Sequence, residues 1–208
     1  MNVRNLIEEN YLHFNAGELR DALRALEIHI EKGNKIFITL SGAMSTARIG
    51  RLLAPAIQKG LIGGICCTGA NLEEDVFNAI EGHRYKQVDW RSLSPIDEEE
   101  LVKDGWNRVT DTCIPENVMQ HVWGLLLKSW NEQSCKTPYF HLCCVLNKLI
   151  EDDVVVPRLN ESWVWAAHNA GIPVFVPGWS DSTTGNMFTA SVKKGEIKTG
   201  YNAVVSDA

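Results

Sequence analysis

The stretch that decides the fold is residues 172–191, IPVFVPGWSDSTTGNMFTAS. A short apolar run over 174–176 stops at a proline and gives way to a polar loop with two glycines and one acid, Asp181, before apolar residues resume at Met187. This order is typical of a buried strand that delivers a polar loop to its carboxyl end, where open α/β sheets bind their ligands. We therefore expect a sheet with Asp181 in a loop at its edge.

Two similar units precede this stretch. The apolar run KIFITL at 35–40 leads into the small polar loop SGAMST at 41–46 and then into a helix-like segment. A second apolar run over 61–66 leads into the loop CTGAN at 67–71 and an acidic turn. This βαβα order predicts a parallel sheet with flanking helices and right-handed crossovers. Its three strand ends should bring these two loops and the loop at 177–186 to one edge.

The N-terminal part of the chain is expected to be helical. Amphipathic spacing over 3–14 and 18–32 predicts two helices that pack by their apolar faces, so that about the first 33 residues precede the sheet. The chain contains no composition break and no linker. Residues 1–208 are therefore expected to form a single domain.

The middle of the chain is less regular. Ser94 and Pro95 form a helix start, and that helix should end near Gly105. A strand is expected over 107–113. Three further helices are expected: 115–130, 138–150, and one capped by Asn160 or Ser162 that ends at Gly171.

The composition indicates a mildly acidic cytoplasmic protein. A net charge of −6 offers no basic face for nucleic acid, and an acidic surface suits a cationic ligand. No apolar run approaches the roughly 18 residues that span a bilayer, and the charged first ten residues do not resemble a signal peptide. The cysteines include two adjacent pairs and no CxxC, so they are expected to be reduced: Cys66, Cys67, Cys113, Cys135, Cys143 and Cys144.

The loops at the predicted sheet edge allow more than one interpretation. Loops rich in Gly, Ser and Thr before helices suit a phosphate, but without a GxGxxG pattern an ordinary βα turn is the better interpretation of each loop taken alone. The consecutive acids Glu73, Glu74 and Asp75 either complement a helix dipole or turn one carboxylate into the site. That carboxylate would hold a ribose hydroxyl or a substrate ammonium, beside Asp181.

Two other features are expected to belong mainly to the core. His141, Cys143 and Cys144 lie within an apolar stretch and have no second ligand cluster, so we predict packing and no metal site. Most of the seven tryptophans are assigned to the core, whereas Trp179 is a candidate to line a ligand pocket.

Four blocks, in order along the chain, resemble the deoxyhypusine synthase family, particularly its bacterial deoxyhypusine-synthase-like branch. They are FITLSGAMSTARIG at 37–50, CTGANLEEDVFN at 67–78, NRVTDTCIPE at 107–116 and PVFVPGWSDSTTGNMF at 173–188. The resemblance runs from about Phe14 to Val192.

The resemblance implies a Rossmann-like NAD-binding fold and a homotetramer with active sites at dimer interfaces. It also implies a reaction in which NAD dehydrogenates a polyamine such as spermidine and an enzyme lysine captures the aminobutyl group as an imine. The group then passes to an acceptor amine and is reduced by the same cofactor. In this family the acceptor is a lysine of a translation factor, or putrescine in relatives that make homospermidine.

The resemblance also assigns residues by position. Glu73 and Glu74 match an acidic pair that borders the polyamine site, where the second glutamate also serves the cofactor. Asn186 occupies a position that faces the polyamine. The implied NAD contacts are Gly42, Ala43, Met44, Ser45, Thr46, Cys67, Thr68, Gly69, Glu74 and Asp181.

Two departures separate this chain from the synthases proper. Asn186 stands where they carry an aspartate, and an amide supplies no charge for an ammonium. The chain also ends at Ala208, before the region where the family places its imine-forming lysine. None of Lys193, Lys194 and Lys198 lies in that motif, so the catalytic residue is unassigned.

Three hypotheses therefore stand. The chain is an NAD-dependent aminobutyl transferase, or a truncated paralogue without activity that binds nucleotide weakly or serves as a partner subunit. The third is a Rossmann-like NAD binder of unrelated chemistry.

Overall fold

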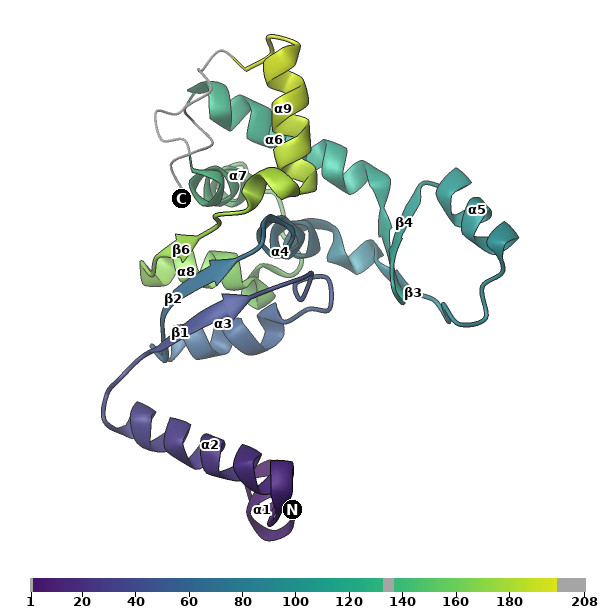
Figure 1. Ribbon diagram of the computed structural model, residues 1–208. Coiled ribbons are helices and arrows are strands. Elements are labelled where there is room, and N and C mark those ends of the chain that lie inside the picture. The colour runs from purple at the N-terminus through teal and green to yellow at the C-terminus, as the bar shows by residue number, and fades with distance from the viewer. Residues whose placement is uncertain (1, 133–136, 198–208) are drawn as a thin grey trace.

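A three-stranded parallel sheet lies at the centre of the computed structural model, which describes residues 2–132 and 137–197 (Figure 1). Its strands are β1 (Ile36–Leu40), β2 (Ile62–Cys67) and β6 (Val174–Phe175), in the order β1-β2-β6. Leu40 pairs with Cys67, and Cys66 pairs with Phe175. The predicted mixed α/β class with a parallel sheet is confirmed.

Helix α4 (Gly69–Glu81) organises the core beside this sheet (Figure 1). Ten of its thirteen residues are buried, and it contacts four other helices. The helices around the sheet and α4 are α3 (Gly50–Gln58), α6 (Glu116–Glu132), α7 (Pro138–Glu151), α8 (Trp163–Ala170) and α9 (Thr183–Lys193). The predicted helices over 115–130 and 138–150 are confirmed, and Ser162 is the residue that caps α8.

The two faces of the sheet differ. On the core face, Ile65 and Val174 are buried at paired positions. On the opposite face, Phe37 and Phe175 are 57% and 46% exposed, and their ring centroids lie 6.4 Å apart. Parallel sheets normally have both faces covered, whereas this apolar face is open to solvent.

The segment before α6 forms a second sheet that the sequence did not predict. Strands β3 (Lys86–Gln87), β4 (Trp106–Val109) and β5 (Thr112–Pro115) pair antiparallel in the order β3-β5-β4. The expected single strand over 107–113 is wrong, because the chain turns back at Thr110, whose φ is 54°. The predicted helix start is confirmed as a capping box at α5 (Pro95–Lys103).

The loop after β6 is shorter than expected. A 3₁₀ turn at Trp179–Asp181 leads directly into α9, so residues 183–186 are helical. Trp179 is only 3% exposed and stacks on Trp130 with 5.7 Å between ring centroids. It is therefore a core residue, and the expectation that it lines a ligand pocket is wrong.

The two N-terminal helices stand apart from the rest of the molecule (Figure 1). They are α1 (Val3–Asn10) and α2 (Phe14–Glu31), joined to each other by the ion pair of Arg24 with Glu8. Most of their apolar side chains are exposed, including Leu19, Leu23 and Leu26. In the described part of the chain, no helix combines the length and apolar character needed to cross a membrane.

Candidate functional site

The three loops predicted to meet do so at the carboxyl edge of the parallel sheet. They surround a solvent-facing hollow of about 380 Å³, here called the sheet-edge hollow, which is within the size range of small-molecule sites. Of the predicted residues, Cys67, Thr68 and Asp181 line it. The full lining is Thr39, Leu40, Ser41, Cys66, Cys67, Thr68, Pro177, Gly178 and Asp181.

Asn71 fixes the first of these loops against the start of α4. Its amide nitrogen donates to the carbonyl oxygen of Gly42 at 2.9 Å, and its amide oxygen accepts from the backbone N–H of Ser45 at 2.9 Å. The Thr68 hydroxyl donates to the same Gly42 carbonyl at 2.8 Å and also caps α4. Because Asn71 is fully buried, these bonds hold the 41–46 loop in one position.

The three consecutive acids of α4 point in three directions, because successive residues of a helix are about 100° apart. Glu73 is 3% exposed and turns toward α9. Its carboxylate accepts from the backbone N–H groups of Thr183 and Thr184 at 3.0 and 2.8 Å, and from the Thr184 hydroxyl at 2.7 Å. In this structure Glu73 therefore anchors the start of α9.

Asp75 anchors the start of α8 in the same way. Its carboxylate accepts from the Ser162 hydroxyl at 2.5 Å and from the backbone N–H groups of Trp163 and Val164 at 3.3 and 3.0 Å. Burial raises the pKa of Asp75 to about 7, although these hydrogen bonds oppose the rise.

Glu74 lies between these two anchors and is less enclosed. Burial, reinforced by the charge of Glu73, raises the pKa of Glu74 to about 7. The Tyr85 hydroxyl donates to its carboxylate at 3.4 Å. The Thr46 hydroxyl lies close enough to lower that pKa, but it makes no hydrogen bond of ordinary geometry with the residues that the structure describes. Glu74 is thus poised to change charge near neutral pH.

Among the described residues, Asp181 is the one charged residue that lines the sheet-edge hollow. Its side chain is exposed and accepts no hydrogen bond from the described residues, so it is available to a ligand. Asn186 lies on an exposed face of α9. Gly69 sits where α4 and α9 approach closely, since an added Cβ would lie 2.6 Å from the Ser182 Cβ.

The remaining residues of the predicted 41–46 loop have different environments. Met44 is 45% exposed, and Ala43 is partly buried. Ser45 and Thr46 are buried, and the Ser45 hydroxyl accepts from the Trp163 indole N–H at 3.0 Å. These two side chains therefore support the loop from inside.

The chemistry available in the sheet-edge hollow is that of hydroxyls, backbone groups and one carboxylate. Such groups fit a hydroxyl-bearing or cationic ligand, and a ribose is one example. Burial raises the pKa of Cys67 to about 12, so its thiol stays protonated and is a poor nucleophile. No lysine lines the hollow in the part of the chain that the structure describes; Lys198 lies outside the described residues.

Two further predictions concern cysteine and histidine. His141 is fully buried, with its Nδ1 2.8 Å from the Ser129 hydroxyl and its ring 3.9 Å from that of Trp130, which confirms its assignment to the core. Cys66, Cys67, Cys113 and Cys143 are free thiols within the described part of the chain, and Cys135 lies outside the described residues. Within 2–132 and 137–197, no three His, Cys, Asp or Glu side chains gather as a metal site would require.

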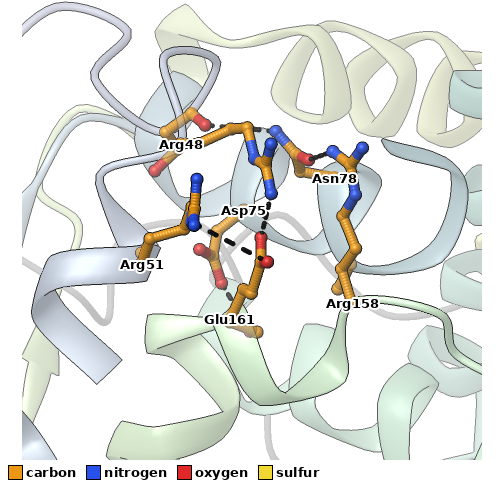
Figure 2. A pocket seen from close by; sticks show the side chains of 10 residues that line it. Arg48, Arg51, Asp75, Asn78, Arg158 and Glu161 are labelled. Atoms are coloured by element: carbon orange, nitrogen blue, oxygen red, sulfur yellow. Dashed lines mark hydrogen bonds and ion pairs between the residues drawn. The ribbon is translucent and has the colours of Figure 1, made fainter. Parts of the chain in front are cut away.

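The sequence reasoning missed a second, basic hollow on the other side of the 41–46 loop. Arg48, Arg51 and Arg158 line it together with Glu161 (Figure 2). The spacing of Arg48 and Arg51 was visible in the sequence, but Arg158 joins them only through the fold. No motif could have linked residues 110 positions apart.

Comparison with known proteins gives a consistent result. A family model described as deoxyhypusine synthase matches residues 6–206. The chain is 25% identical over 185 residues to "Probable deoxyhypusine synthase 1" of Archaeoglobus fulgidus, covering 88% of this chain and 57% of that protein. It is also 25% identical over 179 residues to a "Deoxyhypusine synthase-like protein" of Elusimicrobium minutum, covering 82% and 45%.

Among solved structures, a putative deoxyhypusine synthase from Entamoeba histolytica aligns with a TM-score of 0.49 and 14% identity, covering 80% of this chain and 50% of that one. The chain spans about half the length of the curated relatives it matches. Since the family model covers nearly the whole sequence, the chain belongs to the deoxyhypusine synthase family.

Proposed function

We propose that this protein takes part in NAD-dependent transfer of an aminobutyl group from a polyamine such as spermidine to an amine acceptor. The observation that carries the proposal is the convergence of three loops, each from a block that resembles the family, on one hollow with an available carboxylate at Asp181. The acceptor is either a protein lysine or a free amine such as putrescine.

The cofactor assigned here is NAD in a Rossmann-like arrangement at the sheet edge. Asp181 would hold a ribose hydroxyl, and the backbone of the loops at Gly42 and Thr68 would approach the ligand. Asn71 supports this role, because it preorganises the Gly42 backbone. Bound NAD would accept a hydride and, in its reduced form, would later donate it. Ser45 and Thr46 would act by shaping the loop, since both are buried.

The polyamine is assigned to the acidic side of α4 and the exposed face of α9. Glu74 suits an ammonium group, because a nearby cation favours the charged form of a carboxyl whose pKa is about 7. Glu73 would contribute indirectly, by fixing the start of α9 that carries Asn186. The Asn186 amide accepts a hydrogen bond without adding negative charge. This favours weaker binding of spermidine, or a polyamine whose charge differs from that of spermidine.

Assembly into a homo-oligomer is part of the same proposal. The open sheet face with Phe37 and Phe175 and the leucines of α2 are apolar surfaces exposed in the same chain. Burying such surfaces is the main drive for subunit association. We assign a second copy of this chain as their partner. Sedimentation of the purified protein tests this assignment, and a monomer at high micromolar concentration would contradict it.

The test of function has two stages. Calorimetric titration with NAD should show binding by the 208-residue chain, and Asp181→Asn should weaken it about tenfold through the lost charge-assisted bond. Spermidine and candidate acceptors are then added, and products are identified by mass spectrometry.

The outcomes of the two stages separate the hypotheses. Transfer supports the full proposal. Binding of NAD without any product would support the alternative of an inactive paralogue, and absence of NAD binding would reject the cofactor assignment.

A further inference from the structure

Three arginines from separate segments surround a small basic hollow behind the 41–46 loop. Arg48 precedes α3, Arg51 lies in its first turn, and Arg158 precedes the 3₁₀ turn Leu159–Glu161. Figure 2 shows Arg48 and Arg51 pointing toward Glu161 while Arg158 reaches Asn78. The arginine hollow is defined here as the space among these five side chains.

The charges in the arginine hollow do not balance. Glu161 pairs with Arg48 and, at 3.8 Å, with the Arg51 Nε. The Arg158 guanidinium forms no ion pair within the described part of the chain, and it donates to the neutral Asn78 amide oxygen at 2.9 Å. Asp75 also borders the hollow, but its carboxyl accepts three hydrogen bonds from the start of α8. Of the three guanidiniums, two pair with the Glu161 carboxylate and the third has no carboxylate partner among the described residues, so the group keeps excess positive charge.

Arg48 carries two further marks of a binding residue. Its Nε is buried and has no hydrogen-bond partner within the described part of the chain, although buried donors are nearly always satisfied. Its backbone φ is 61°, in the left-handed region that is unusual for a residue with a side chain. A single ion pair that ties α3 to the Leu159–Glu161 turn would need neither feature, nor a third arginine.

The size of the hollow limits how a ligand binds. Its enclosed part is about 10 Å³, which holds one water-sized atom. Arg51 is 61% exposed and Arg48 is 37% exposed, so both also face solvent at the mouth. A tetrahedral oxyanion can place one oxygen inside and leave the others at the mouth, where planar guanidiniums bind them in pairs.

We propose that Arg48, Arg51 and Arg158 form a binding site for a phosphate group, either as inorganic phosphate or as the terminal group of a phosphomonoester. The assignment does not rest on the proposed transferase function. The two hollows are distinct, since Ser41 lines the sheet-edge hollow and Ser45 lines the arginine hollow from the other end of the loop. Glu161 acts as the internal anion that a phosphate displaces.

Titration of the full 208-residue chain with inorganic phosphate tests the proposal. Binding is followed by calorimetry at constant ionic strength, with chloride as the competing anion, because surface charge effects are screened by salt. Arg51→Gln should weaken phosphate binding about tenfold. Glu161→Gln should strengthen it severalfold, because it removes the competing carboxylate. Arg91→Gln, on an exposed arginine stacked on Trp90, is the matched control and should change nothing.

Circular dichroism first establishes that both variants are folded. Arg51→Gln and Glu161→Gln should then change the phosphate affinity in opposite directions. A purely structural ion pair would not produce this result. Equal affinity in the wild type and Arg51→Gln would overturn the proposal, as would phosphate binding no tighter than chloride. A phosphomonoester such as AMP is titrated in parallel to identify which source binds better. If only NAD binds and Arg51→Gln weakens that binding, the arginines belong to a dinucleotide site and the separate site is rejected.

Discussion

The helices α8 and α9 begin in the same way but open onto opposite environments. In each, a serine caps the helix, and an acid of α4 accepts the first backbone N–H groups: Ser162 with Asp75 for α8, and Ser182 with Glu73 for α9. The start of α8 borders the arginine hollow, whereas the start of α9 follows the loop of Asp181 and the sheet-edge hollow.

This difference shows how one helix orders two hollows of opposite charge. Carboxylates stabilise helix N-termini by hydrogen bonding and by the helix dipole. Acids two residues apart point to different sides of α4, so it fixes both junctions and leaves Glu74 between them to face Tyr85. If this view is correct, damage to one junction should disturb its own hollow more than the other.

Asp75→Ala should have the largest effect. It leaves the Ser162 hydroxyl and two backbone N–H groups buried without an acceptor, and we expect a loss of about 3 kcal/mol in the free energy of unfolding. Urea denaturation measures this loss. Asp75→Asn keeps an acceptor oxygen and should cost clearly less. Equal stability of the wild type and Asp75→Ala would contradict the anchoring role.

Glu73→Gln should come next, at about 2 kcal/mol, because a neutral amide accepts fewer and weaker hydrogen bonds from Thr183 and Thr184. The comparison predicts that it perturbs ligand binding at the sheet edge and not phosphate binding at the arginines. Glu99→Gln, on a 72% exposed side chain, is the control and should be neutral. Equal disturbance of both hollows would break the comparison.

The pH dependence of the free energy of unfolding should reveal the ionisation of Asp75 at the start of α8. The pKa of Asp75 is raised from 3.8 to about 7, so the folded state holds a proton that the unfolded state releases. This contribution to stability is complete below about pH 4 and is lost as pH rises toward 7. Glu74 acts in the same direction. The slope should approach about 1 kcal/mol per pH unit for each group.

Denaturation of the wild type, Asp75→Asn and Glu74→Gln between pH 4.5 and 7.5 measures these slopes. Each substitution should remove the part of the decline in unfolding free energy that its own carboxyl causes. A wild-type stability that rises with pH across this range, with the same rise in both variants, would show that the two carboxyls ionise normally in the fold.

Asp181→Ala should have the smallest effect on stability, within about 0.5 kcal/mol, because its side chain is exposed and has no ion-pair partner in the described part of the chain. A loss above 1 kcal/mol would show that Asp181 is structural. Together with weaker NAD binding, an unchanged stability would separate the ligand-binding acid of this edge from the anchoring acid, Glu73.

The parts of the fold that were predicted correctly are those that depend on residues close together in the sequence. The apolar runs over 35–40 and 61–66 and the serine-proline start of α5 are readable because burial and capping depend on neighbouring residues. The antiparallel hairpin was missed, because nothing in the residues around Thr110 required a left-handed turn. Trp179 was misjudged for a related reason: its partners, Trp130 and Phe188, include a residue 49 positions away.

For the site, the sequence by itself determined the family, the parallel order of the strands and the convergence of three loops at one edge, because strand polarity follows from the βαβα order. Only the tertiary structure decided what each acid of α4 does, since the direction of a side chain on a buried helix matters only once its neighbours are in place. The same holds for the arginine hollow, where like charges from distant segments come together because packing of α3, α4 and α8 brings them there.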